Sequence, residues 1–248
     1  MEKLVKRLRA VAALIPPGKK VADIGTDHAM LPIFLIQSET AAGVIASDIN
    51  KGPFQRAKTI VHLQGLEDFI DIRLGNGLKV LEPGEVQVIV ISGLGGFTIV
   101  DIFNECPQVL EKVETLVLSP VTHESEVRRW LKEKGWQIKD EDLVEDQNRI
   151  YQIIQACPNG NHRQEEWTEL EYDVGPIIIK KRHPLLKEYL ERKLKKYEQA
   201  VNSLMNSQSL ESAKKTRSLR NTMEELCKLI DLLPNARRNN NGNMSKGD

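Results

Sequence analysis

The chain has 248 residues, of which 40% are hydrophobic and 28% are charged, and this composition excludes a largely disordered or collagen-like protein. No apolar run approaches about 18 residues, and the first ten residues carry charges throughout, so we expect no membrane span, no secretory signal and a cytoplasmic location. The net charge of zero conceals an asymmetry: residues 180–248 have 16 Lys and Arg against 8 Asp and Glu, a net of +8, and residues 1–179 have 19 against 27, a net of −8. A basic appendage on an acidic body predicts a polyanionic partner, with a solvated helical hairpin as the alternative.

The first two thirds of the chain alternate between short apolar runs and helical periodicity. An amphipathic helix is expected over residues 1–17, closed by Pro16-Pro17-Gly18. Five strands are expected within the apolar runs that begin at Val21, Gly43, Ile70, Val86 and Thr115. The helices expected with them cover residues 28–39, 51–64, 96–111 and 123–134.

After Gly135 the pattern changes. Residues 136–139 and 149–156 read as two strands with no room for a helix between them, so we expect an antiparallel pair that closes a parallel sheet. Residues 157–175 look loop-rich, and apolar residues then recur at spacings of three and four in two stretches that predict an antiparallel coiled-coil hairpin. The domains expected are a catalytic domain (1–160), a connecting segment (161–183), the hairpin (184–233) and a disordered tail (234–248).

The first apolar run ends in a carboxylate, a glycine and a polar turn, Asp23-Ile-Gly-Thr-Asp-His28, just before a helical pattern. Gly25 allows the backbone to come close to a ligand, and Thr26 or Asp27 can cap the following helix. Ligand binding is expected at the carboxyl end of such a strand. A dinucleotide-binding loop needs three glycines, and this loop has one together with acidic side chains, so a pyrophosphate ligand is disfavoured.

The next three runs also end in glycine or acidic residues. The second ends at Asp48, 25 positions after Asp23, close to where nucleotide-binding folds place a carboxylate on ribose hydroxyls, with a helix N-cap as its alternative role. The third ends in Gly75-Asn-Gly77, where an amide can bond an adenine edge, and the fourth ends in Ser92-Gly-Leu-Gly-Gly96. Strand ends that converge on one crevice form the ligand site of an open parallel sheet.

This order of elements resembles the class I S-adenosylmethionine-dependent methyltransferases. With the C-terminal hairpin, the particular motifs resemble the bacterial tRNA (adenine-22, N1)-methyltransferase family over residues 1–233. Leu94 stands where the family pattern Gly-Met-Gly-Gly has Met, a conservative change. The resemblance implies an α/β fold with a seven-stranded Rossmann-like methyltransferase sheet and a C-terminal two-helix coiled-coil hairpin. The motifs that carry it are Asp23-Ile-Gly-Thr-Asp-His-Ala29 with Leu31-Pro32, Gly75-Asn-Gly-Leu78, Pro83-Gly84-Glu85 and Ser92-Gly-Leu-Gly-Gly96.

The resemblance also implies a set of cofactor contacts. Asp48 would accept hydrogen bonds from the ribose hydroxyls of S-adenosylmethionine, and Asn76 would contact its adenine. Asp23 and Gly25 would support its methionine, and Gly93 would let the base or the sulfonium approach the backbone, although the glycines could serve only tight turns. The expected cofactor-binding residues are Asp23, Gly25, Thr26, Asp48, Ile49, Asn76, Gly77, Ser92 and Gly93.

Asp27 and His28 are the candidate catalytic residues, with helix capping as their alternative role. Adenine N1 has an in-plane lone pair that can attack a sulfonium methyl directly, so positioning and charge stabilisation should matter more than a strong base. The Asp27 carboxylate is the candidate for stabilising the cationic product. The Asn/Asp-Pro-Pro-aromatic loop typical of methyltransferases that modify exocyclic amines is absent after the fourth strand, which disfavours such a target.

Adenine N1 is paired in duplex RNA, so the target nucleotide must be flipped or unpaired. Basic side chains of the first helix and the hairpin can hold phosphates without reading sequence: Lys6, Arg7, Arg9, Lys193, Lys196, Lys214, Lys215 and Arg217. Three other functions stay open, namely a methyltransferase for a small molecule or protein whose hairpin serves oligomerisation, an NAD-dependent dehydrogenase, and a non-catalytic RNA-binding protein.

The three cysteines are widely spaced and include no C-x-x-C pair. We therefore expect free thiols, no disulfide framework and no metal site. The expected partner is tRNA, and no association with a membrane is expected. The oligomeric state does not follow from the sequence, although a monomer is slightly favoured.

Overall fold

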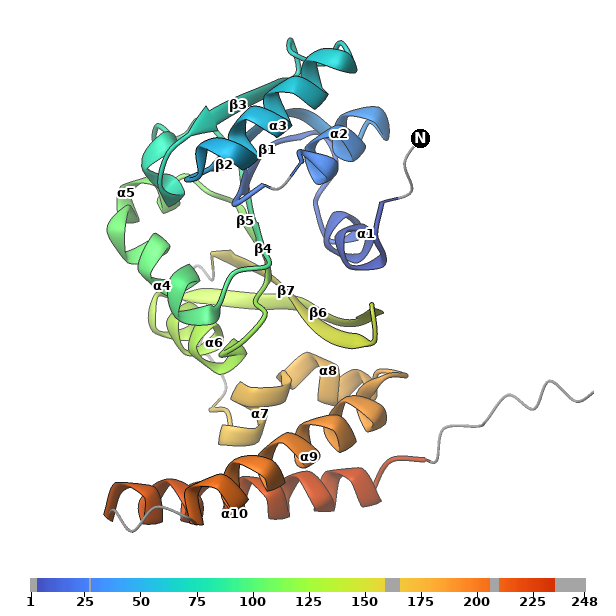
Figure 1. Ribbon diagram of the computed structural model, residues 1–248, viewed down its shortest axis with the longest axis vertical. Helices are drawn as coiled ribbons and strands as arrows, with labels where there is room; N and C mark the ends of the chain where they lie inside the picture. The colour runs from blue at the N-terminus through green and yellow to red at the C-terminus, as the bar shows by residue number, and fades with distance from the viewer. Residues whose placement is uncertain (1–3, 27, 159–165, 206–209, 235–248) are drawn as a thin grey trace, which may run out of the picture. The chain divides into compact units, whose positions relative to one another are not determined.

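A computed structural model describes residues 4–26, 28–158, 166–205 and 210–234 of the chain (Figure 1). The chain divides into two compact units, Met1–Lys181 and Arg182–Asp248. The four-part division at residues 160, 183 and 233 stays a prediction. No helix within the described ranges is both long and apolar enough to cross a membrane.

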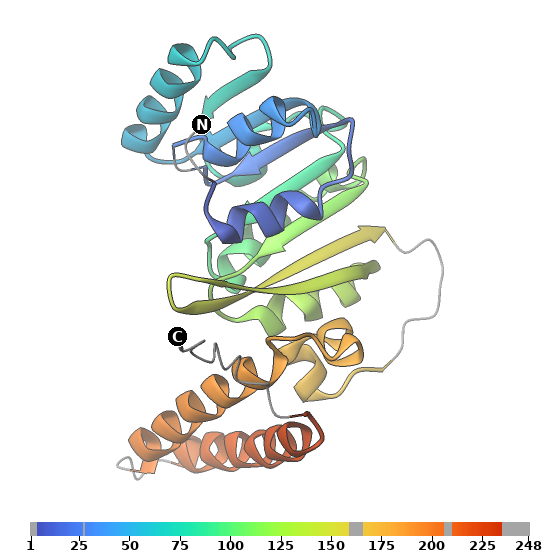
Figure 2. The ribbon, with the colours of Figure 1, turned by 90° about the vertical axis from the view of Figure 1, so that its right-hand side faces the viewer.

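The first unit is built on a seven-stranded mixed sheet with helices on both faces (Figure 1, Figure 2). Its strands are β1 Lys19–Ile24, β2 Ala41–Asp48, β3 Ile70–Leu74, β4 Val88–Ser92, β5 Thr115–Ser119, β6 Trp136–Asp146 and β7 Arg149–Pro158. They lie in the order β3-β2-β1-β4-β5-β7-β6. The first five are parallel, and β7 pairs antiparallel with both β5 and β6. The predicted α/β sheet and its antiparallel closing pair are confirmed.

Two apolar clusters hold helices against the two faces of this sheet. Strand residues alternate between them: Ile89 and Ile91 of β4 face one cluster, and Val88 and Val90 face the other, as a strand buried on both faces requires. The first cluster includes residues of α4 Gly96–Glu105, α5 Pro107–Leu110, α6 Glu124–Glu133 and the 3₁₀ turn η1 Gly77–Val80. The second includes residues of α1 Lys6–Ala13, α2 Met30–Gln37 and α3 Lys51–Leu63.

Several helix ends differ from their predicted positions. The helix expected over residues 96–111 is interrupted at Cys106, because Pro107 has no N–H to continue the hydrogen-bond ladder. The N-cap of α2 is Ala29, in a left-handed conformation and without a side-chain cap, so the prediction that Thr26 caps this helix is wrong. Asp27 lies outside the described residues.

The connecting segment expected over residues 161–183 contains two short helices: α7 Glu169–Val174, within the stretch that looked loop-rich, and α8 Pro176–Lys181, just after it. Thr168 and Glu171 form a reciprocal capping box at the start of α7. The capping pattern was present in the sequence, but a helix of six residues carries too little periodicity to be recognised from it.

A buried ion pair fixes these helices to the sheet. Arg128 Nε lies 2.7 Å from Glu141 Oε1, and both side chains are fully buried. Arg128 also donates to the Tyr172 carbonyl at 2.9 Å, and Glu141 Oε2 accepts from the Ile177 amide at 2.9 Å. Each charge therefore has a further hydrogen-bond partner in α7 or α8 besides the opposite charge, as a buried ion pair requires.

The second unit consists of α9 Leu186–Met205 and α10 Leu210–Asp231, which pack against each other. The predicted helical hairpin is present, whereas its coiled-coil geometry stays a prediction. The tail expected to be disordered lies outside the described residues beyond Pro234.

Candidate active site

A cavity of about 230 Å³ opens where the carboxyl ends of β1 and β4 meet α1 and the β6–β7 hairpin. Four of its lining residues are among those predicted to bind the cofactor, and others come from the first helix and the β6–β7 hairpin, which the motifs do not cover. The six that matter most are Arg7, Asp23, Gly25, Thr26, Ser92 and Tyr151.

Asp23 is the buried carboxylate of this cavity, with 6% of its surface exposed. Burial raises the pKa of Asp23 to about 6, and a hydrogen bond from the Thr26 side chain partly offsets that rise. The backbone amides of Gly25 and Thr26 both donate to the Ser47 carbonyl at 2.8 Å, which fixes the loop to β2. A carboxyl group held in this way favours a cationic ligand, because a nearby positive charge restores its ionised form.

Ser92 ends β4 beside Asp23 and contributes an unpaired polar atom. Its Oγ is buried and has no hydrogen-bond partner among the described residues. Buried hydroxyls are seldom left unpaired in folded proteins. Gly93 follows with φ +95°, so the backbone approaches the cavity without a side chain.

A second group of predicted residues gathers at the ends of β2 and β3. Asp48 Oδ1 accepts a hydrogen bond from the Asn50 amide at 2.7 Å, and Asn50 occupies the N-cap position of α3, so the alternative role of Asp48 as the N-cap is wrong. Asn76 is exposed after β3. Ile49 and Leu74 are large apolar side chains with 61% and 43% of their surfaces exposed. An acidic acceptor beside exposed apolar side chains suits a ribose and an adenine ring.

Gly77 has a packing reason to be glycine. Its φ is +53°, and a Cβ atom there would lie 3.0 Å from a methyl carbon of Ile102 in α4. Gly77 is buried, so its lack of a side chain is explained by the packing against α4, and its contact with the cofactor stays a prediction.

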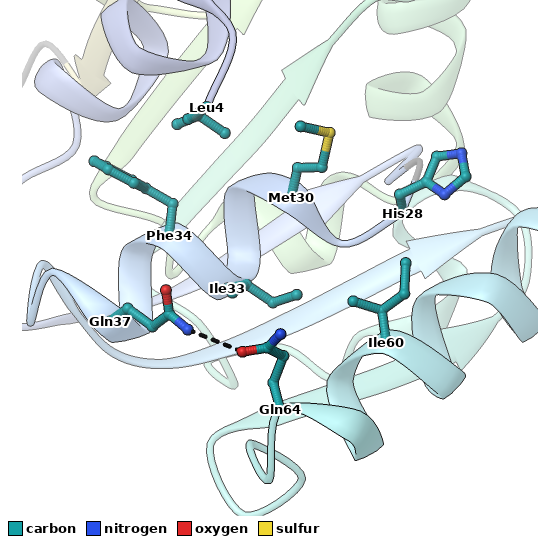
Figure 3. Close-up of a pocket in the computed structure, with 8 residues that line it drawn as sticks. All are labelled: Leu4, His28, Met30, Ile33, Phe34, Gln37, Ile60 and Gln64. Carbon is teal, nitrogen blue, oxygen red and sulfur yellow. Dashed lines mark hydrogen bonds between the residues drawn. The ribbon is translucent and has the colours of Figure 1, made fainter. Parts of the chain in front are cut away.

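His28 lies at a different cavity. This space of about 440 Å³ is lined by residues of α2 and α3, and Figure 3 shows the His28 ring at one end of it, beyond Met30 and Ile60. A hydrogen bond of 3.4 Å between Gln37 and Gln64 lies at the other end. Of the two candidate catalytic residues, His28 thus lines a different cavity from Asp23, although Met30 borders both cavities, and Asp27 is outside the described residues.

Arg7 enters the cavity from α1; the sequence predicted it as an RNA contact and not as a residue of this cavity. A Cβ atom added to Gly93 would lie 3.6 Å from the Arg7 guanidinium, so the two are in close proximity. The guanidinium carbon also lies 4.9 Å from the centroid of the Tyr151 ring, and that of Arg149 lies 5.3 Å from it. Arg149 and Tyr151 are two positions apart on β7, which places their side chains on one face. That spacing was the only indication in the sequence that these two side chains lie together.

The other residues predicted to bind RNA are mostly at the surface of their own units. Lys6 and Arg9 are exposed on α1, and Lys196, Lys215 and Arg217 are exposed on the hairpin. The side chain of Lys214 is not among the side chains that the structure describes. Lys193 is half-buried, with its Nζ 5.3 Å from the Tyr189 ring centroid. The described residues contain no cluster of three His, Cys, Asp or Glu side chains that could hold a metal ion.

Comparison with known proteins identifies the family. The family profile described as tRNA (adenine(22)-N(1))-methyltransferase matches residues 21–228. The Bacillus subtilis (strain 168) tRNA (adenine(22)-N(1))-methyltransferase is 33% identical over 92% of this chain and 98% of its own length. The crystal structure of the B. subtilis m1A22 tRNA methyltransferase has a TM-score of 0.83 and 31% identity, and covers 93% of this chain and all of that one. A Streptococcus pneumoniae protein solved with S-adenosyl-L-methionine has a TM-score of 0.80 and 29% identity, over 90% and 98% of the two chains. The chain therefore belongs to the tRNA (adenine(22)-N(1))-methyltransferase family, whose cofactor is S-adenosylmethionine.

Proposed function

We propose that the 230 Å³ cavity is the place where this enzyme methylates N1 of adenine 22 in tRNA. The observation that carries the proposal is the convergence, at one group of strand ends, of a buried carboxyl, a buried unpaired hydroxyl and a guanidinium stacked on an aromatic ring. These belong to Asp23, Ser92 and the Arg7–Tyr151 pair.

The residues present fit the cofactor. When bound, S-adenosylmethionine supplies a methyl group on a positively charged sulfonium. Asp23 would hold the ammonium of its methionine, and the Ser92 hydroxyl would gain a polar partner. Asp48 would accept from the ribose hydroxyls, while Ile49 and Leu74 would border the adenine ring. Gly25 and Gly93 leave the backbone open along the path between these ends.

The protein groups around the target base need to position it and to tolerate the positive charge of the product. Because the N1 lone pair lies in the plane of the ring, no side chain has to remove a proton from N1. Asp27 remains our candidate for stabilising the cationic product, and His28 for a supporting contact. The Arg7 guanidinium is better suited to a phosphate than to the base, since it would repel a methylated, cationic adenine.

The substrate is a polyanion, and the charge distribution of the chain suits it. Residues 180–248 carry the net charge of +8 and include exposed Lys196, Lys215 and Arg217. These side chains would hold tRNA phosphates without reading bases. We propose a cytoplasmic monomer that acts without a metal ion, because tRNA is modified where it is used and the chain's own residues suffice for the transfer.

The test uses the full-length protein and an unmodified tRNA transcript. Incubation with labelled S-adenosylmethionine, nuclease digestion and mass mapping should place one methyl group on N1 of adenine 22. A transcript with guanine at position 22 should take up no label. Methylation at another position, or equal labelling of both transcripts, would contradict the proposed target.

A further inference from the structure

Phe97 is an exposed aromatic residue near the proposed site. It is the second residue of α4, and 53% of its surface is exposed. Its ring centroid lies 4.5 Å from that of His123, at an interplanar angle of 43°. His123 is itself exposed and is the N-cap residue of α6. Two loops that follow different strands thus bring two aromatic rings together at the surface.

The backbone holds this pair in place. The Gly96 amide donates to the Thr122 carbonyl at 2.7 Å, and the Val121 amide donates to the Leu94 carbonyl at 2.9 Å. A Cβ atom at position 96 would collide with the carbonyl group of His123. His123 adopts a left-handed conformation with φ +57°, which is costly for a residue other than glycine. The rings are therefore held in place by a tightly fitted backbone with one residue in a costly conformation.

The pair also lies close to the methyl-transfer cavity. Phe97 is four residues beyond Gly93, so their Cα atoms are at most about 14 Å apart. Arg149, which faces Tyr151 in the cavity wall, donates to the Val121 carbonyl at 2.6 Å. The loop that carries His123 is thus joined directly to the wall of the cavity.

We propose that Phe97 and His123 form a stacking platform for an unpaired base of the tRNA next to adenine 22. This inference rests on the proposed function, because exposing N1 of adenine 22 takes that base out of its stack and leaves a neighbouring base without a partner. Aromatic side chains stack on any base through its π face. A protein partner is a poorer fit, since a stable interface buries about 1,600 Å² and the platform is one pair of rings.

The chain offers a matched control for a test. Phe69 is also 53% exposed, but it precedes the amino end of the edge strand β3, whereas the cavity lies at the carboxyl ends of the central strands β1 and β4. Phe97→Ala should weaken tRNA binding about 5- to 150-fold, the range expected for loss of one base stack, and leave the affinity for S-adenosylmethionine unchanged. Phe97→Trp should retain tRNA affinity, and Phe69→Ala should match the wild type.

A fluorescent base makes the readout specific. The full-length variants are titrated with tRNA that carries 2-aminopurine at position 21 or 23, whose emission falls when it stacks on an aromatic ring. Wild type and Phe97→Trp should quench one of the two positions, and Phe97→Ala should not. Unchanged tRNA affinity and quenching in Phe97→Ala, loss of binding in Phe97→Trp, or an equal loss in Phe69→Ala would each overturn the platform. A wild-type enzyme that fails to methylate adenine 22 would instead overturn the proposed function.

Discussion

At the scale of single residues, Asp23 links the pH dependence of cofactor binding to that of stability. Its pKa is about 6 because burial disfavours the charged form. An ammonium group beside it needs the ionised form, so affinity for S-adenosylmethionine should rise between pH 5 and pH 7 and level off above. Asp23→Asn should flatten this profile and weaken binding at pH 7 by about tenfold or more, as measured by calorimetric titration.

The same variant should have the opposite effect on the free protein. Burial raises the pKa of Asp23 from its ordinary value of 3.8 to about 6 in the folded protein. The free energy of unfolding should therefore fall as the pH rises from about 4 to about 6, by roughly 3 kcal/mol at most, and stay at that lower level above pH 6. Asp23→Asn should therefore raise the melting temperature at pH 7 and change it little at pH 4. A variant that binds the cofactor with an unaltered pH profile would exclude Asp23 from contact with the ammonium.

Asp48 offers a comparison at the ribose end of the site. Asp48→Ala should weaken S-adenosylmethionine binding by about 1–3 kcal/mol, because two hydroxyls lose a charged acceptor. Asp48→Asn keeps an oxygen that can accept from the Asn50 amide, so it controls for the local turn while removing the charge. Calorimetric titration should rank wild type above Asn and Asn above Ala; equal affinities in all three would remove Asp48 from the site.

The sequence could predict the site residues at the ends of strands. It could not predict the site residues that come from helices or strands far away along the chain. Asp23, Asp48 and Ser92 each end an apolar run, so their convergence follows from the parallel sheet. Arg7 lies near Gly93 and Tyr151 through contacts that span 86 and 144 positions of the chain. No local spacing encodes such contacts, and a basic residue on an amphipathic helix is usually a solvated one.

At the scale of elements, the junction between the β4–α4 and β5–α6 loops depends on one glycine. A Cβ atom at position 96 meets the His123 backbone, whereas one at position 95 would meet the hydroxyls of Thr122 at 3.2 Å and Thr98 at 3.9 Å. Gly96→Ala should force the loops apart, lower the melting temperature by several degrees and reduce methyl transfer. Gly95→Ala should have a smaller effect on both the melting temperature and methyl transfer. Thermal melts and turnover assays of the two variants test this; similar behaviour would show that the junction can relax.

The type and order of the strands were predictable because each is a short apolar run bounded by turn residues. The elements that were missed depend on tertiary contacts. The two helices after β7 form in what the sequence suggested was only a connecting segment, and they are held by the buried pair of Arg128 and Glu141. A buried arginine has no signature in sequence, because its partners are 13 residues or more away.

At the scale of the whole molecule, the proposed cofactor site and the excess of positive charge lie in different parts of the chain. All residues proposed to contact the cofactor belong to the first unit, and the excess of positive charge begins at about residue 180. The two-helix hairpin was predictable from its 3- and 4-residue spacing, since that pattern is local. The function of its positive charges could not be predicted in the same way, because it depends on the substrate and not on the periodicity or packing of the helices.

Removal of the second unit should affect the use of tRNA without affecting the binding of S-adenosylmethionine. A chain that ends at residue 181 should bind S-adenosylmethionine with wild-type affinity, because the cofactor loops are all in the first unit, and should lose most of its activity on tRNA. In the full-length protein, Lys196→Glu, Lys215→Glu and Arg217→Glu together should weaken tRNA binding.

The salt dependence of that triple variant gives the decisive measurement. Each lost phosphate contact should reduce the slope of log affinity against log salt by about 0.7–0.9, whereas Lys112→Glu, an exposed change between α5 and β5, should leave the slope unaltered. Full activity of the shortened chain, together with an unchanged slope in the triple variant, would assign the hairpin a role other than RNA binding. Loss of both tRNA and cofactor binding on truncation would instead make the hairpin a structural support of the first unit.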